Sequence, residues 1–198
     1  MDSNHKGAEG VLLDFDGTLT RPALDWPAMK EEMRLGSGEV SILDYLPTLS
    51  PERAREVAAI LDRHERAAAE RAEPNEGAAE LVAYLERSGL PFGVVTNNAM
   101  RHVRPMLERI GIRVEIVITR DIGIWKPDPR MVLAGAAAIG APPERCVLIG
   151  DGRYDMMAAR AAGMTSLLLS PAPGPACDHR VARLGEAIPL LEKLRSRK

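Results

Sequence analysis

Short apolar runs alternate with segments of helical periodicity along most of this chain, and this alternation restricts the fold more than any other feature. The runs at 11–13, 92–96, 114–119, 146–150 and 165–169 have the length and composition of buried strands, and a sixth short strand is expected at 181–184. Helices are expected at 77–88, 99–110, 129–139 and 155–162, with a terminal helix from Ile188. Units of this kind join parallel strands, so the pattern predicts an α/β fold: a Rossmann-like, doubly wound, mostly parallel sheet.

Residues 21–74 interrupt the alternation directly after the first strand. This segment is poor in β-branched residues and rich in Ala, Glu and Arg. We expect a short helix ending at Gly36, a second at 39–46 stopped by Pro47, and a long helix with Ser50 at its N-cap and a proline at its first position. The sequence therefore predicts an α/β core formed by residues 1–20 and 75–198, with a small all-helical cap at 21–74.

The long cap helix carries arginines and acids in similar numbers, which predicts a solvated face with ion pairs rather than a surface for nucleic acid. Its acids are Glu52, Glu56, Asp62, Glu65, Glu70 and Glu73.

Composition excludes several classes of partner. Lys and Arg number 26 against 28 Asp and Glu, a net charge of −2, so there is no overall attraction to nucleic acid or to an anionic membrane. No apolar stretch is long enough to span a bilayer, and the polar start does not resemble a signal peptide. Cys146, in an apolar run, and Cys177, in a loop, fit a reducing compartment, and we expect a cytoplasmic protein.

The first, second and fourth long apolar runs are each followed by polar groups that could act together. Asp14 and Asp16 come after the first, 96–98 (Thr-Asn-Asn) close the second run, and Asp151 and Asp155 follow the run at 146–150. Parallel strands present their carboxyl ends at one edge of a sheet, where such folds bind ligands. Four acids at this edge need a cation, and Mg²⁺ is the simplest oxygen-preferring choice.

Lys126 adds a positive charge to the same inventory. Pro127 favours an extended backbone at the lysine, while Asp128 and Pro129 suit the N-cap and first position of the next helix. A cation, a lysine and loop amides freed by glycine together suit a phosphate group. A carboxylate beside them can serve as a nucleophile, and a second carboxyl can transfer protons.

Four segments in this order, DFDGTLT, VVTNN, KPDP and GDGRYD, resemble the motifs of the haloacid dehalogenase-like (HAD) hydrolase superfamily, and the inserted cap resembles its phosphoglycolate phosphatase-like branch. The resemblance implies that Asp14 is the nucleophile and Asp16 the general acid and base. It further implies that Thr96 hydrogen-bonds the transferred phosphoryl group and that Lys126 stabilises its charge.

The same resemblance implies a set of binding residues. Mg²⁺ would be held by the Asp14 carboxylate, by Asp151 and by the main-chain carbonyl of Asp16. Asp155 would orient a metal-bound water or the lysine. The residues expected to bind substrate are Gly17, Thr18, Asn97 and Asn98.

The resulting functional prediction is a Mg²⁺-dependent phosphatase that hydrolyses a small phosphorylated metabolite through an aspartyl-phosphate. Asp16 argues against the dehalogenase branch, which has no acid at that position. Lys30, the only cap lysine, has no surroundings that favour the Schiff base used by the phosphonate-cleaving branch. A sugar phosphomutase and a non-catalytic module of the same fold are the alternatives, and a homodimer is compatible with so short a cap.

Several other residues are candidates for contacts near the site. Arg21, at the hinge to the cap, and Arg101 are candidates to contact substrate, whereas Trp125 is expected to pack beside the lysine. The histidines at 5, 64, 102 and 179 lack the spacing of metal ligands and are expected on the surface or on helix faces.

Overall fold

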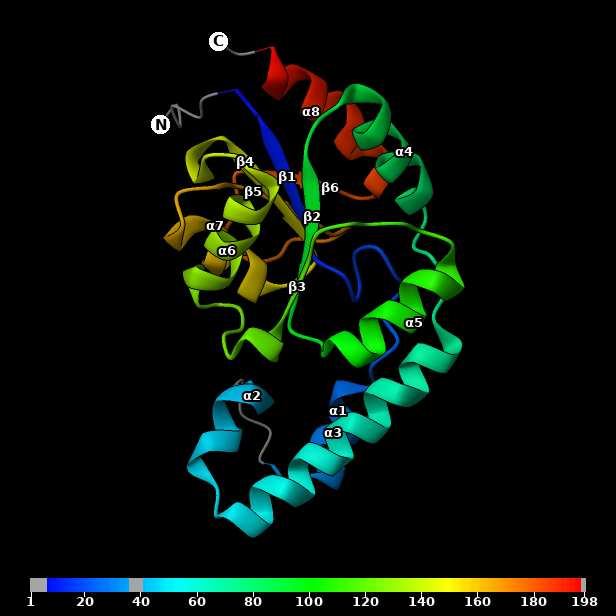
Figure 1. Ribbon diagram of the computed structural model, residues 1–198, viewed down its shortest axis with the longest axis vertical. Helices are drawn as coiled ribbons and strands as arrows, with labels where there is room; N and C mark the ends of the chain where they lie inside the picture. Colours follow the sequence, from blue (N-terminus) through cyan, green and yellow to red (C-terminus); the bar gives the residue numbers. More distant parts are fainter. Residues whose placement is uncertain (1–6, 36–40, 197–198) are drawn as a thin grey trace.

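A six-stranded sheet in the order β3-β2-β1-β4-β5-β6 forms the centre of the molecule in this computed structural model, which describes residues 7–35 and 41–196 (Figure 1). The strands are β1 (Gly10–Leu13), β2 (Phe92–Thr96), β3 (Val117–Thr119), β4 (Cys146–Gly150), β5 (Thr165–Leu169) and β6 (His179–Val181). Every pairing between them is parallel. The predicted doubly wound α/β fold is confirmed.

Helices cover both faces of the sheet, as the alternating directions of strand side chains require. Val11 and Leu13 contribute to the core beneath α4 (Ala78–Ser88), α5 (Met100–Ile110) and α8 (Ala187–Arg195). Leu12 points to the opposite face, which is covered by α6 (Pro129–Ile139) and α7 (Arg153–Ala161) (Figure 1). The central strand is therefore buried on both sides, which explains its continuous apolar run.

Two strands differ from their predicted ranges. β3 begins at Val117 rather than at 114, because it is an edge strand and its first predicted residues are only partly covered. β6 covers 179–181 rather than 181–184, because pairing with β5 places His179 opposite Leu167. The chain then enters the 3₁₀ helix η4 (Leu184–Glu186).

Helix boundaries follow the predicted caps closely. Asp128 caps α6 through Arg130 N–H, as expected. α7 starts at Arg153, two residues earlier than predicted, because Asp155 accepts a hydrogen bond from the main-chain N–H of Gly152 and fixes the first turn. The remaining short helices of the core are η2 (Arg120–Ile122) and η3 (Pro143–Arg145).

The cap comprises α1 (Trp26–Glu32), α2 (Ile42–Tyr45), η1 (Leu46–Thr48) and α3 (Pro51–Arg71), inserted between β1 and β2. The second helix ends at Tyr45, just before Pro47 as predicted, and the chain continues in the 3₁₀ helix η1, which contains this proline. The predicted end at Gly36 and the start of the second helix at 39 lie outside the described residues. Ser50 caps α3 as predicted.

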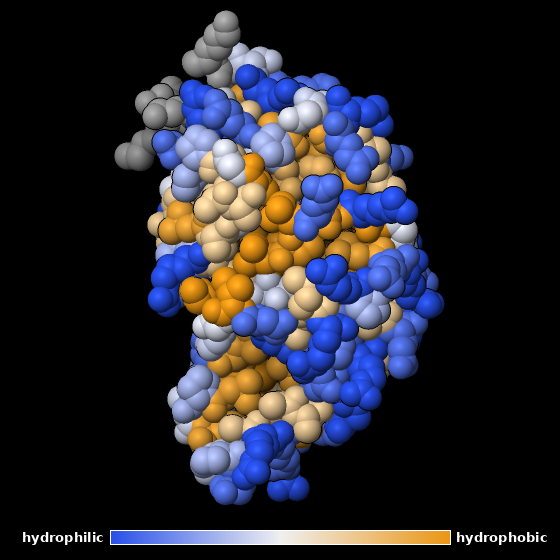
Figure 2. All heavy atoms as spheres, viewed as in Figure 1, coloured by the Kyte–Doolittle hydropathy of each residue, from blue (hydrophilic) through white to orange (hydrophobic). Residues whose placement is uncertain are grey.

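The cap has a small core of its own and lies beyond the carboxyl ends of the strands (Figure 1). Its buried side chains are Met29, Met33, Ile42, Leu43, Val57, Ile60 and Leu61. Figure 2 shows apolar side chains between α2 and α3 and hydrophilic ones along the outer side of α3. At the hinge, the two segments that connect the core to the cap lie side by side, since Thr20 bridges to Pro74 and Arg21 N–H donates to the carbonyl of Glu73. The division at 20/21 and 74/75 thus fits this hinge and remains a prediction.

Among the described helices, none combines the length and apolar character that a membrane crossing requires.

Close packing of α6 on the sheet gives a prediction. A Cβ added at Gly135 would lie 2.7 Å from Val95 Cγ1, nearer than real contacts allow. We expect Gly135→Ala to lower the free energy of unfolding by roughly 1–3 kcal/mol in urea titrations, although alanine favours helix. The control Ala137→Gly, at an exposed position of the same helix, should lose about 1 kcal/mol from propensity alone. Increased stability of Gly135→Ala would show that this contact is not tight.

Candidate active site

The carboxyl ends of β1, β2 and β4 meet the cap around a cavity of about 640 Å³. β1 lies between the other two strands, so residues far apart in sequence converge there. Of the predicted site residues, those lining the cavity are Asp14, Asp16, Gly17, Thr96, Asn97, Asn98, Lys126, Asp151 and Asp155. Thr18 is not among them. The structure therefore brings together nearly all of the predicted set, whose individual roles remain predictions.

Lys126 is the centre of this arrangement. Its ammonium Nζ donates to Asp14 Oδ1 at 2.5 Å, to Asp155 Oδ1 at 2.6 Å and to the carbonyl of Val95 at 2.9 Å. The side chain is buried. Burial alone would lower the pKa of Lys126, but the two carboxylates outweigh it and raise the pKa above its usual value. The lysine is therefore a permanent positive charge in the floor of the cavity.

The acids in this floor form the group of described residues that could hold a metal ion. Asp14, Asp151 and Asp155 each offer a carboxylate oxygen, and these oxygens lie within 4.8 Å of one another. Carboxylate oxygens are the ligands that Mg²⁺ prefers. Both oxygens of Asp155 already accept hydrogen bonds, from Lys126 and from Gly152 N–H. This fits the prediction that Asp155 orients its neighbours, while Asp14 and Asp151 hold the cation.

The electrostatics of the acids also favour a cation. Burial raises the pKa of Asp14 well above its ordinary value, and the charge of Asp155 adds to this effect. Burial, together with repulsion from Asp155 and Asp16, raises the pKa of Asp151 to about 7. The single charge of Lys126 does not neutralise so many carboxylates. A divalent ion among them would stabilise their ionised forms.

Asp16 lies at the junction between the first loop and the cap. Its Oδ1 accepts hydrogen bonds from Ala23 N–H at 3.3 Å and from the Thr20 hydroxyl at 3.5 Å. Burial raises the pKa of Asp16 to about 6, even though these two hydrogen bonds oppose the shift. A carboxyl with such a pKa can both release and accept a proton near neutral pH.

The turn after Asp16 depends on glycine. Gly17 has φ +83°, and a Cβ there would lie 2.1 Å from Asp151 Oδ2. Only glycine allows the first loop to approach the loop after β4 this closely. The neighbouring Thr18 is buried, and its hydroxyl has no hydrogen-bond partner. Asn75, which the sequence analysis did not single out, holds this turn by donating to the carbonyls of Gly17 and Thr18.

Thr96 ends β2, and Asn97 and Asn98 follow it. The side chains of these three residues have different surroundings. The buried Thr96 hydroxyl accepts from Asn98 N–H at 3.2 Å. Asn97 binds the main chain of Lys126 twice: its Oδ1 accepts from Lys126 N–H at 2.8 Å, and its Nδ2 donates to Lys126 O at 2.9 Å. Asn97 therefore fixes the backbone of the lysine, in addition to lining the cavity.

The cap contributes a wall that the sequence analysis did not foresee. Glu65 was expected on a solvated face, but it is buried in the cavity wall and paired with Arg120 of the core. Asp62, on the same helix, binds Arg101 and the buried His102. The error arose because helical spacing shows which residues share a face but not what that face meets. The available signal in the sequence was spacing: Glu65 follows Val57 and Leu61 at intervals of four residues, which puts an acid on the apolar face of the helix.

Two other candidates are now placed. Arg21 is exposed and paired with Glu73, away from the cavity lining. Arg101 likewise does not line it. Trp125, which was expected to pack beside the lysine, packs against the core of the cap, and its Nε1 donates to Asp44 of α2 at 2.6 Å.

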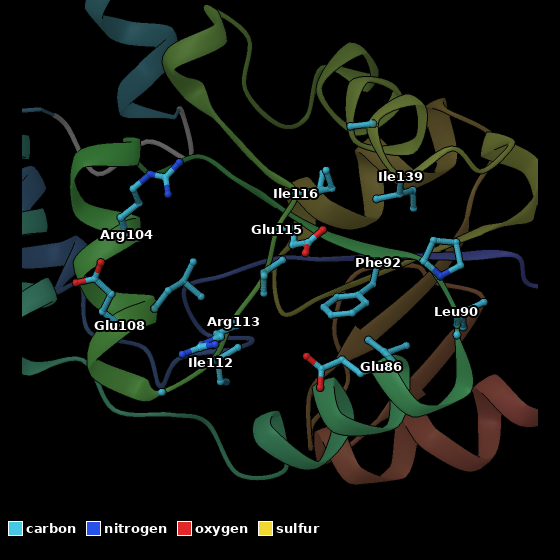
Figure 3. A pocket seen from close by; sticks show the side chains of 17 residues that line it. Glu86, Leu90, Phe92, Arg104, Glu108, Ile112, Arg113, Glu115, Ile116 and Ile139 are labelled. Atoms are coloured by element: carbon cyan, nitrogen blue, oxygen red, sulfur yellow. The ribbon is translucent and has the colours of Figure 1, made fainter.

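A second cavity, drawn in Figure 3, is larger, about 1180 Å³, and its lining includes none of these acids. It is bounded by α4, α5 and the segment from Ile112 to Ile116, near the beginning of β2 rather than its end. Its charged residues are Glu86, Arg104, Glu108, Arg113 and Glu115. None of the convergent carboxylates reaches it, so we assign the chemistry to the smaller cavity.

Comparisons with known proteins agree with this geometry. A sequence model of the haloacid dehalogenase-like hydrolases matches residues 8–163. An N-acetylmuramic acid 6-phosphate phosphatase of Pseudomonas aeruginosa is 30% identical over 184 residues, covering 78% of either chain. A phosphoglycolate phosphatase of Xylella fastidiosa is 32% identical, covering 80% of this chain and 78% of that one.

Solved structures show the same fold. A hydrolase from Pseudomonas syringae superposes with a TM-score of 0.80 at 23% identity, covering 95% of this chain and 100% of that one. A HAD family hydrolase from Deinococcus radiodurans, solved with bound phosphate and sodium, has a TM-score of 0.70 at 24% identity and covers 95% of this chain and 96% of that one.

The acid cluster predicts binding of Mg²⁺ and its loss on removal of one acid. We expect isothermal titration calorimetry with MgCl₂ to show Asp151→Asn binding about tenfold or more weakly than the wild type, because a ligand charge is lost. Asp128→Asn is the matched control, since Asp128 is paired with Arg130 and does not line the cavity. Equal affinity of Asp151→Asn and wild type would contradict the assignment.

Proposed function

The chain belongs to the haloacid dehalogenase-like hydrolases, and we propose that it is a phosphatase that hydrolyses a small phosphorylated metabolite with the help of Mg²⁺. Two of its relatives at 30% and 32% identity are named phosphatases of phosphorylated small molecules. The observation that carries the proposal is the position of Lys126. It bridges two carboxylates at the floor of a cavity that cap residues help to line.

This arrangement suits phosphoryl transfer, which depends mainly on positioning and on neutralisation of charge. The phosphoryl oxygens would lie against Lys126, with the Thr96 hydroxyl and loop amides as further donors. Mg²⁺, held by Asp14, Asp151 and the main-chain carbonyl of Asp16, would supply the second positive charge. Both charges favour the ionised carboxylate of Asp14.

The reaction proceeds in two steps. First, an Asp14 carboxylate oxygen attacks phosphorus, the bond from phosphorus to the ester oxygen breaks, and Asp16 gives its proton to the leaving alcohol. Second, water attacks the aspartyl-phosphate while Asp16 takes a proton from it, and the bond between Asp14 and phosphorus breaks. Inorganic phosphate leaves, and both carboxyl groups return to their starting states.

The cavity limits the class of substrate. Its volume of about 640 Å³ holds a small molecule rather than a macromolecular segment. Most cap residues that line the cavity are apolar, namely Pro22, Trp26, Ile42, Leu43 and Leu61. The polar ones are Lys30, Ser41 and Glu65. We therefore propose a phosphomonoester whose leaving group carries an apolar surface against the cap.

The sequence left two alternatives, and they differ in products. A sugar phosphomutase would return the phosphoryl group to a second hydroxyl of the same substrate, so isomer formation would replace release of inorganic phosphate. A non-catalytic module would bind Mg²⁺ without turnover of any member of a broad panel of phosphorylated metabolites. Assay of free phosphate across such a panel distinguishes all three.

Loss of the nucleophile is the direct test. With p-nitrophenyl phosphate and Mg²⁺, we expect Asp14→Asn to reduce turnover below detection, because the amide cannot form the phosphoryl-enzyme. Wild type incubated with ³²P-labelled substrate and quenched in acid should retain label that Asp14→Asn does not.

Asp128→Asn is the control for removal of a nearby carboxylate outside the cavity, and asparagine preserves its capping role. Its turnover should stay within about twofold of wild type, as expected for a surface change away from the chemistry. Full activity of Asp14→Asn would refute the proposed function.

A further inference from the structure

The cap and the core are joined by a buried ion pair in the wall of the cavity. Glu65 on α3 is 2% exposed, and its partner Arg120, in η2 after β3, is 14% exposed. Arg120 donates through Nη1 to one carboxylate oxygen of Glu65 and through Nη2 to the other at 2.8 Å. Figure 1 shows that α3 runs from the cap alongside the core helix α5. The pair therefore connects α3 of the cap to η2 of the core.

Arg120 has a third acceptor, and it leads toward the phosphoryl site. Its Nη1 also donates to the main-chain carbonyl of Asn97 at 2.7 Å. The Asn97 side chain in turn holds the main-chain N–H and carbonyl of Lys126. Lys126 then contacts Asp14. An unbroken series of hydrogen bonds thus connects the cap helix to the proposed nucleophile.

Stability alone does not explain this pair. A buried ion pair is often no more stabilising than apolar side chains of similar volume, because both charges must be desolvated. What the guanidinium provides is geometry: its planar fork holds two carboxylate oxygens and a carbonyl at once. A lysine ammonium lacks that fixed fork.

We propose that Arg120 is a positioning residue, which binds Glu65 and Asn97 together and so couples docking of the cap to the alignment of Lys126 with Asp14. This inference rests on the proposed function, because it is the phosphoryl site that the lysine serves. With the cap docked, the residues that follow β2 and the segment that carries Lys126 are held in one arrangement. Without the pair, the fold persists but the connection from the cap through Asn97 to the lysine is lost, and the link from Trp125 to Asp44 remains.

Asp62 provides a matched comparison on the same helix. It lies three residues before Glu65 and also joins the cap to the core, through Arg101 and His102. Their described hydrogen bonds do not reach Asn97 or Lys126, and their nearest approach to the pair is His102 Nε2, 3.7 Å from the Glu65 carboxylate. Removing this second link should loosen the cap without disturbing the lysine.

The test uses paired variants of the full chain. Glu65→Leu alone and Arg120→Met alone each leave a buried charge and should lower the melting temperature, whereas the double variant removes both charges and should recover most of it. We expect the double variant to lose about 10-fold to 100-fold in kcat with p-nitrophenyl phosphate, with a smaller change in KM, because the lysine is misaligned. Arg120→Lys, which keeps the charge and the fold, should show the same kcat loss.

A second readout does not depend on turnover. The ¹⁵Nζ resonance of Lys126, identified by its absence in Lys126→Met, should shift in the double variant and in Arg120→Lys. Asp62→Asn should leave that resonance in place and kcat within about twofold of wild type, as for a change away from the chemistry.

The outcomes separate the inference from the proposed function. Recovery of wild-type kcat together with stability in the double variant would reduce the pair to a structural role and overturn the inference. A raised KM with an unmoved Lys126 resonance would also overturn it, since Arg120 would then contact substrate directly. If wild type itself fails to hydrolyse phosphate esters, the proposed function falls, and the resonance alone decides the coupling.

Discussion

The structure depends on one buried positive charge among several negative ones. Asp14, Asp151 and Asp155 are brought together at the strand ends, where their mutual repulsion and loss of water oppose folding. Lys126 offsets part of that cost by bonding to two of them at 2.5 Å and 2.6 Å. Removing one member of a buried pair costs about 3–5 kcal/mol, so the lysine is a structural requirement as well as a chemical one. The negative charge that remains is why these acids could hold a divalent cation.

The rest of the molecule serves to hold that charge in place. The parallel sheet brings β1, β2 and β4 together. Asp128, the N-cap residue of α6, fixes the chain just after the lysine, and Asn97 fixes the main chain of the lysine itself. Gly17 lets the first loop touch Asp151. These supports come from four separate segments of the chain. Their convergence follows from the topology, because the carboxyl ends of parallel strands share one edge.

Much of this arrangement was predictable from sequence, because it follows from local rules and from topology. Apolar runs, glycine stops and N-cap residues predicted the strands and helices, and strand order then brought the acids and the lysine together. Contacts between the cap and the core were not predictable. Glu65 and Arg120 are 55 residues apart, and nothing local to either indicates the other. The edge strand β3 was predicted too long for a related reason, since periodicity cannot show where neighbouring strands stop covering it.

The size of the cap gives its contacts with the core a particular importance. Its own apolar core consists of the side chains of α1, α2 and α3 and is small, so packing within the cap does little to set its orientation. Orientation comes instead from the hinge and from polar links between cap and core. Two of these links, Trp125 to Asp44 and Arg120 to Glu65, start in the segment that precedes Lys126. One link starts at the residue before Lys126, and the other reaches the Lys126 main chain through Asn97. The proposed coupling of the cap to the lysine follows from the way the cap is held. A cap with a larger core of its own would depend less on such links, which here are the ones proposed to align Lys126 with Asp14.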